Sequence, residues 1–245
     1  MGFGPGPGGP GGPGGPEMRN TVTNAPYSGV EVTTEQQALA GGNVIQRQTT
    51  RNVFRDSQGR VRVETQFTRP GANGQSTTVT RISIFDPVAG TASEIDPQNK
   101  VVNSRPFHPG TQGAMRPRNP NGATGARAAR PADPNVKSED LGTQSVNSVI
   151  AKGSRVTHTI PAGTIGNAMA IQSVHETWMA ADLQVPVTVK VTDPRFGTRT
   201  TQLTQINRGE PDASLFQIPA GYTVHKGGPG GRGPRPGNNG GGQKN

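Results

Sequence analysis

The feature that most constrains this chain is a two-residue alternation of apolar and polar side chains in short runs. In the run from Arg60 to Thr68, Val61, Val63, Thr65 and Phe67 fall on one side, and charged or amide side chains fall on the other. Successive side chains of a β-strand point to opposite faces of its sheet, so this run predicts a strand with one buried face.

Turn-forming residues separate such runs about every 8 to 12 positions, which is typical of antiparallel β structure. Asp86-Pro87 and Asp193-Pro194 are two of these turn signals. No long stretch has helical periodicity, and Asp212 is predicted to cap one short turn that ends near Phe216. The pattern predicts strands at 28–39, 43–55, 60–69, 75–86, 90–96, 141–150, 153–160, 171–181, 185–192 and 198–207.

One of these predicted strands contains a proline. Val185, Val187, Val189 and Val191 alternate with polar positions, but Pro186 lies among them. Proline has no backbone N–H to donate to a neighbouring strand. We therefore expect this strand to lie at a sheet edge or to begin after Pro186.

Glycine and proline concentrate in segments that have little apolar surface to bury. Residues 1–20 and 226–245 are predicted to be disordered tails, and residues 103–137 a flexible basic insert. Each half of the remaining chain has few large apolar side chains, so a shared core would bury more surface. The sequence therefore predicts one mainly β domain over residues 21–225, built as a curved, half-barrel-like antiparallel sheet.

The charge of the chain follows the same division. The formal net charge is +9, yet residues 100–137 hold seven basic side chains against Asp133 alone, and residues 226–245 hold four more with no acid. The remaining segments sum to about −1. We expect weak, salt-sensitive contact with polyanions through residues 100–137 and 226–245 and no shaped nucleic-acid site.

Several classes of protein are disfavoured by residues that are missing. The chain has no cysteine, which excludes disulfides, cysteine-ligated zinc and thiol catalysis. No apolar run approaches the roughly 18 residues of a transmembrane helix. Met1 is followed by glycine and proline, so the sequence as given begins without a signal peptide. The oligomeric state is left open.

Three phrases of the sequence resemble known proteins. VFRDSQGRVRVETQF (53–67), FDPVAGTASEIDPQNK (85–100) and the run from Val189 to Tyr222 resemble uncharacterised bacterial exported proteins. More distantly, they are similar to the LolA-like lipoprotein-sorting superfamily. The resemblance covers roughly residues 27–102 and 139–224.

The resemblance implies a curved antiparallel half-barrel with a hydrophobic cavity. It also implies that the C-terminal end of the domain is marked by Phe216, Pro219 and Tyr222, and that the protein has a periplasmic or secreted location. That location would require an export signal upstream of Met1. The chain departs from the superfamily in lacking a lipidation cysteine and the long amphipathic helices that cover a carrier's cavity.

The histidines are the first candidates for chemistry. His158 shares a predicted strand face with Val156 and Ile160, so a half-buried structural histidine is expected, while a cross-strand cluster with His175 stays open. Glu176 follows His175 directly and would point to the opposite face. No nucleophile elbow occurs, and the paired carboxylates lie in predicted loops. We therefore predict a non-catalytic protein without a cofactor.

Two functional hypotheses remain. The first is an exported β-rich protein that holds a lipid or another apolar ligand; the second is an interaction protein whose basic flexible segments bind polyanionic surfaces or nucleic acid. For the first, the same large side chains could instead form a closed core. The predicted apolar ligand face consists of Val61, Val63, Phe67, Phe85, Trp178, Val187 and Val189.

Overall fold

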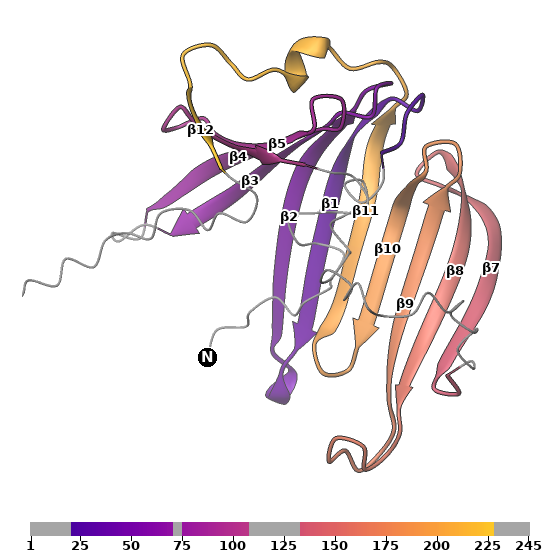
Figure 1. Cartoon of the computed structure of the whole chain (residues 1–245). Coiled ribbons are helices and arrows are strands. Elements are labelled where there is room, and N and C mark those ends of the chain that lie inside the picture. The colour runs from indigo at the N-terminus through magenta and orange to yellow at the C-terminus, as the bar shows by residue number, and fades with distance from the viewer. Residues whose placement is uncertain (1–20, 71–74, 108–132, 228–245) are drawn as a thin grey trace, which may run out of the picture.

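The alternating runs form the strands of one open, curved sheet (Figure 1). The computed structural model describes residues 21–70, 75–107 and 133–227. Across these residues the strand order is β12-β6-β5-β4-β3-β2-β1-β11-β10-β9-β8-β7. The strands are β1 (Tyr27–Ala38), β2 (Val44–Arg55), β3 (Val61–Pro70), β4 (Ser76–Asp86), β5 (Thr91–Asp96), β6 (Val101–Pro106), β7 (Val136–Val146), β8 (Val149–Ile160), β9 (Ile171–Ala180), β10 (Val185–Asp193), β11 (Gly197–Asn207) and β12 (Thr223–Lys226).

The predicted fold class is confirmed, and each of the ten predicted strands is present. The largest shift in bounds is in β7, which was expected at 141–150. Its hairpin to β8 turns at Asn147 and Ser148, whose φ angles are 50° and 66°. This left-handed pair suits a two-residue hairpin turn, and Asn147 also donates a hydrogen bond of 2.9 Å to the Leu203 carbonyl. The turn contains no glycine and was therefore missed.

The bounds predicted for the flexible insert, 103–137, were wrong at both ends. β6 continues to Pro106, and Phe107 is buried against Phe85 with ring centroids 5.6 Å apart. β7 begins at Val136. The remainder of the insert (108–132) and the segments 1–20 and 228–245 lie outside the described residues.

β12 was also missed. It is four residues long and pairs in parallel with β6, so the sheet is mixed rather than purely antiparallel. Lys226, which was assigned to the C-terminal tail, is the last residue of this strand. A strand this short offers too little alternation to be found from its sequence.

Both positions expected for the proline-containing strand were wrong, because β10 lies between β9 and β11 and begins at Val185, before Pro186. The register of β10 against β9 shifts between Pro186 and Thr188, and pairing with β11 begins only at Thr188. Pro186 pairs with Met179, the irregularity follows it at Val187, and no β11 partner faces Pro186, so its missing N–H costs no bond to β11.

The main core lies at one end of the sheet, the upper end in Figure 1. We define the inner face by Tyr27, Val53, Val63 and Leu203, which alternation and register place on one side of β1, β2, β3 and β11. Strands from both halves of the chain contribute to one cluster, so the sheet curls toward this face. The cluster contains Tyr27, Val53, Val61, Val63, Phe85, Ala92, Phe107, Val149, Ala151, Ala180, Leu183, Val185, Val187 and Leu203.

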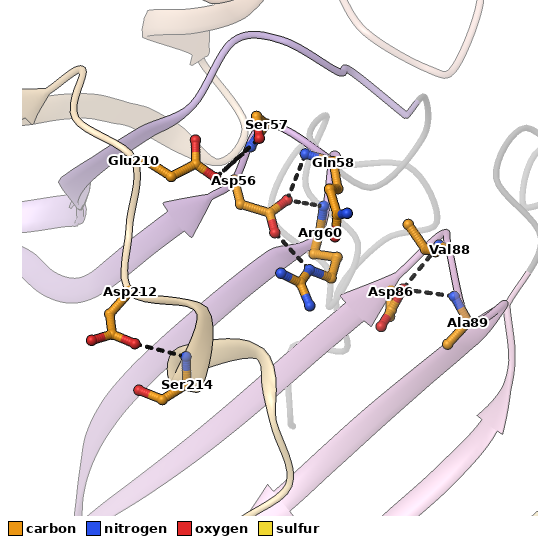
Figure 2. Close-up of polar contacts among 10 residues, drawn as sticks. All are labelled: Asp56, Ser57, Gln58, Arg60, Asp86, Val88, Ala89, Glu210, Asp212 and Ser214. Atoms are coloured by element: carbon orange, nitrogen blue, oxygen red, sulfur yellow. Dashed lines mark hydrogen bonds and ion pairs between the residues drawn. The ribbon is translucent and has the colours of Figure 1, made fainter.

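A C-terminal strap, residues 208–227, crosses from the end of β11 to β6. The short 3-10 helix η3 (Ala213–Phe216) begins as predicted, with the Asp212 carboxylate accepting from the Ser214 N–H (Figure 2). Arg62 Nη1 donates to the Leu215 carbonyl at 2.8 Å. Tyr222 packs on a second apolar cluster of Ile82, Ile84, Ile95 and Val102, on the face opposite the main core.

Arg55, at the end of β2, joins three parts of the core end. Its Nε and Nη2 atoms donate to the Ala25 carbonyl at 2.9 and 2.7 Å, and Nη2 also donates to the Leu183 carbonyl between β9 and β10. The guanidinium stacks on the Tyr27 ring at 4.7 Å. Arg55 is only 1% exposed, so these contacts replace its hydration.

Replacing Arg55 with lysine should lower the free energy of unfolding by about 2–3 kcal/mol, because a single ammonium cannot form the fork to both carbonyls and stack on the ring. Urea unfolding followed by the fluorescence of Trp178 measures this loss, and we expect one transition. Arg105→Lys, at an exposed position of β6, is the matched control. An equal effect of the two substitutions would contradict the role given to Arg55.

Candidate functional site

At the end of the sheet opposite the core, the inner face is hollowed by a groove of about 470 Å³. We call it the open-end groove. The last residues of β1 and β10 and the first residues of β2 and β11 form its walls. It is lined by Glu35, Gln36, Gln37, Ile45, Arg47, Val191, Asp193, Phe196, Gly197, Thr198 and Arg199.

Three apolar side chains lie in the groove. Val191 is half-buried, whereas Ile45 and Phe196 are 40% and 60% exposed. Phe196 comes from the turn between β10 and β11, and Ile45 comes from the second residue of β2. These side chains supply an apolar surface that the folded chain leaves in contact with water.

Charged side chains line the same groove. Arg199 Nε lies 3.6 Å from Glu35 Oε1, and Arg195 pairs with Asp193 at 2.7 Å. Hydrogen bonding from Arg195 lowers the pKa of Asp193 below its ordinary value, which keeps this carboxylate ionised. Arg47 lies opposite Glu35 on the neighbouring strand, yet it forms no ion pair within the described part of the chain.

Polar contacts separate the groove from the core. Arg51 and Glu31 form a largely buried ion pair, and the hydroxyls of Thr33 and Thr201 are 2.9 Å apart. Alternation places these residues on the inner face between Val53 and the groove. The inner face is therefore apolar at the core end, polar in the middle and amphipathic at the open end.

Gly197 fixes the approach of β11 to β1 at the groove. Its φ is 93°, and a Cβ atom there would overlap the carbonyl oxygen of Gln36. Gly163, in the loop between β8 and β9, also has a positive φ of 79° but no atom within 4 Å of an added Cβ. The two glycines therefore differ in steric contact and share the left-handed backbone.

Gly163→Ala should cost about 1–2 kcal/mol through backbone strain alone. Gly197→Ala should cost about 1–3 kcal/mol more, because β11 must move away from Gln36. Urea unfolding of the two variants measures the difference. Equal losses would show that the close approach to β1 is not a constraint.

The structure brings the two candidate histidines together on the inner face beside the groove. His175 lies between Val191 on β10 and Val156 on β8, and His158 is its diagonal neighbour. The Nε2 atom of His175 is buried and has no hydrogen-bond partner in the part of the chain that the structure describes. Burial, and secondarily the charge of His158, lowers the pKa of His175 below its ordinary value of 6.5.

This lowered pKa makes stability depend on pH. Below about pH 6.5 the unfolded chain protonates at position 175 before the folded protein does, so the free energy of unfolding should fall until the pH reaches the folded pKa. His175→Gln should reduce this fall between pH 7.5 and 5.5, measured by urea unfolding at each pH. His225→Gln, on exposed β12, should keep the full decline; equal slopes for His175→Gln and the wild type would contradict the assignment.

The predicted apolar ligand face is divided by the structure. Five of its residues are buried: Val61, Val63, Phe85, Val187 and Val189. Phe67 is half-buried beneath the Arg81 guanidinium, 5.6 Å from its ring centroid. Trp178 is half-buried over Gly153, where a Cβ would lie 2.6 Å from its ring.

The open-end groove was missed by the sequence analysis. Its residues come from four strand ends and one turn, so no alternation pattern links them. The only signal was the aromatic residue in the turn Asp193-Pro194-Arg195-Phe196-Gly197, where Phe196 is exposed and contacts the Arg195 guanidinium, 5.0 Å from its ring centroid.

A second hollow, of about 360 Å³, lies on the outer side of β7 to β10. Its charged residues alternate in sign across four strands. Arg155 bonds Glu176 at 2.8 Å, and the register places Glu139 opposite Arg155 and Lys190 opposite Glu176. Such a cross-strand row is explained by sheet stabilisation. In the described ranges no three histidine or carboxylate side chains form a metal-binding cluster, and no helix is long and apolar enough to cross a bilayer.

No family model and no curated protein matches the chain. Among solved structures, it is similar to an uncharacterised conserved protein from Thermus thermophilus, at 10% identity and a TM-score of 0.42, over 86% of this chain and 94% of that one. The complex of MucA and MucB from Pseudomonas aeruginosa matches at 15% identity and 0.42, over 85% of this chain and 61% of the matched chain.

A LolA superfamily protein from Nitrosomonas europaea matches at 7% identity and a TM-score of 0.27, over 82% of this chain and 93% of that one. The matches thus include the lipoprotein-sorting group that the sequence phrases resemble. Similarities of this size carry no argument about ligands or partners. The function is therefore argued from the residues of this chain.

Proposed function

We propose that this protein is a non-catalytic, exported binding module that holds one amphipathic ligand in the open-end groove. The ligand's alkyl chain lies against Ile45, Val191 and Phe196, and its anionic head group pairs with Arg47. The observation that carries the proposal is that exposed apolar side chains line the same groove as Arg47, which forms no ion pair in the described part of the chain.

The size and composition of the groove support a small ligand. Ligand sites commonly measure about 300–1,000 Å³ and combine apolar walls with a few polar groups that fix orientation. The open-end groove, at about 470 Å³, falls in this range. Its walls are strand ends held by the sheet, so they are ordered before a ligand binds.

The arginines favour an anionic head group. Arginine presents a planar set of donors that matches a carboxylate or phosphate. Arg199 offers a second donor, because its Nε atom is buried, lies 3.6 Å from Glu35 Oε1 and has no hydrogen-bond partner among the described residues. An anionic head group between Arg47 and Arg199 would accept a hydrogen bond from this Nε atom.

The second hypothesis, binding of polyanions by residues 100–137 and 226–245, stays a prediction. Most of these residues lie outside the described ranges. The apolar ligand face predicted from the sequence also stays a prediction, and its five buried members could contribute only by opening the core.

A matched pair of ligands tests the proposal. A long-chain fatty acid should bind and raise the melting temperature, since binding to the folded state stabilises it, whereas the alcohol of equal length should bind more weakly. Arg47→Gln should weaken the binding of the fatty acid about tenfold or more, because a charge-assisted hydrogen bond contributes about 1.5–3 kcal/mol. It should leave the affinity for the alcohol unchanged. Isothermal titration calorimetry measures both affinities.

Two controls complete the experiment. Phe196→Ser should lower the affinities for the acid and the alcohol alike, since it removes only apolar contact. Arg105→Gln should lower neither affinity. Failure of the wild type to bind either ligand would refute the proposed function. Binding that Arg47→Gln and Phe196→Ser do not alter would place the ligand elsewhere.

A further inference from the structure

The two ends of the sheet differ in what their loops expose. Three loops of the open end carry large exposed apolar side chains. Ile165 and Met169, between β8 and β9, are 58% and 79% exposed, and Phe196, between β10 and β11, is 60% exposed. Leu39, Val44 and Ile45, around the β1–β2 turn, are also exposed.

The strand register shows that these three loops share one end. Gln36, near the end of β1, pairs with Thr198 at the start of β11. Thr192, at the end of β10, pairs with both Thr198 and Val174, and Val174 in turn pairs with Thr157 of β8. The loops 39–43, 161–170 and 194–196 therefore extend beyond the same end of the sheet, the lower end in Figure 1.

Charged side chains are rare on the three open-end loops and frequent in the turns at the core end. Loops 39–43 and 161–170 contain no charged residue, and 194–196 contains only Arg195. The turns at the core end instead carry Asp56, Asp86, Asp182, Glu210 and Asp212, four of which are shown in Figure 2. Glu210, for example, accepts from the backbone N–H of Ser57 at 3.0 Å and from its hydroxyl at 3.1 Å. Among the described residues, the core-end turns therefore carry carboxylates, two of them paired with Arg60 and Arg208, whereas the three open-end loops carry none; Asp133, before β7, is an exposed carboxylate beside the end of β8.

We propose that the open end docks on a phospholipid bilayer, with the three loop tips inserted shallowly among the head groups. Large apolar side chains with uncharged neighbours gain free energy when they leave water for the acyl boundary. Arg195 lies on one of the tips and Arg47 lies on β2 behind another, where each could pair with a lipid phosphate. No carboxylate on the tips opposes an anionic surface.

A bilayer fits this end better than a rigid protein partner. Ile45 and Phe196 meet in the open-end groove, whereas Ile165 and Met169 stand on a separate loop outside its lining, so the exposed side chains are not gathered in one site that a folded partner would complement. A fluid interface accepts separate side chains without matching their shape. The inference does not require a ligand in the open-end groove, although the groove opens at this same end.

Vesicle binding by the full chain tests the inference. The probe is neutral phosphatidylcholine vesicles in about 1 M salt, where charges are screened beyond about 3 Å and contacts made by the basic segments are suppressed. Wild-type protein should co-sediment with these vesicles. The double variant Ile165→Ser with Met169→Ser should bind about tenfold more weakly, because two side chains lose their burial. Phe196→Ser should also weaken binding.

The control variant combines Val88→Ser with Ile150→Ser, which removes equally exposed apolar side chains away from the three loops. It should bind as the wild type does. Equal melting temperatures of all variants show that each one folds. Equal losses in the control and loop variants, or binding confined to anionic vesicles at low salt, would overturn the inference.

A fluorescent label distinguishes a bilayer from a second copy of the chain. The protein has no cysteine, so Ile165→Cys and Val88→Cys each give one labelling site. With an environment-sensitive dye, the label at 165 should shift to the blue on adding vesicles, and the label at 88 should not. A shift at 165 that follows protein concentration without vesicles, accompanied by dimers in sedimentation velocity, would assign the surface to self-association and refute the proposal.

Discussion

The fold depends on closing one end of an open sheet with very little apolar material. Aromatic residues make up only 4% of the chain, so neither half could bury enough surface alone. The sheet therefore curls until β1 to β5 and β8 to β11 share one core, and Arg55 completes the closure by binding the carbonyls of Ala25 and Leu183. A buried cation is costly unless it is fully hydrogen-bonded, so these parts must come together correctly for the core to form.

Closure at one end leaves the other end free for function. Side chains such as Arg51 and Glu31 cover the middle of the inner face with polar contacts, so the core does not extend along the strands. Beyond them, the strand ends spread into the open-end groove. No covering helix is needed, because most of the inner face is either packed on itself or polar. The exposed apolar residues at the open end are the exception, and both proposals rest on them.

Alternation was enough to predict the curved sheet and ten of its strands, because each was a run with one apolar face. It failed where another interaction decided the structure. β6 and β12 are too short for a pattern to emerge, and Pro186 was misjudged because β11 pairs with β10 only from Thr188 onward and leaves Pro186 without a partner on that side. The left-handed turn at Asn147 moved the β7–β8 hairpin. The groove could not be predicted, since Ile45 and Phe196 meet only through the registers of β1, β2, β10 and β11.

The turns also show why the two ends could diverge in chemistry. At the core end, carboxylates form the turns themselves: Asp56 accepts from the backbone N–H groups of Gln58 and Arg60, and Asp86 accepts from those of Val88 and Ala89 (Figure 2). At the open end, glycine at positions 41, 42 and 163 supplies the left-handed backbone of two loops that contain no charge, whereas the β10–β11 turn uses Gly197 together with the Asp193 carboxylate, which accepts from the Arg195 N–H. A loop shaped by glycine is free to carry apolar side chains into a lipid interface, whereas a turn held by a carboxylate would bring a charge with it. The uncharged turns of loops 39–43 and 161–170 therefore suit the open end to the membrane contact proposed for it.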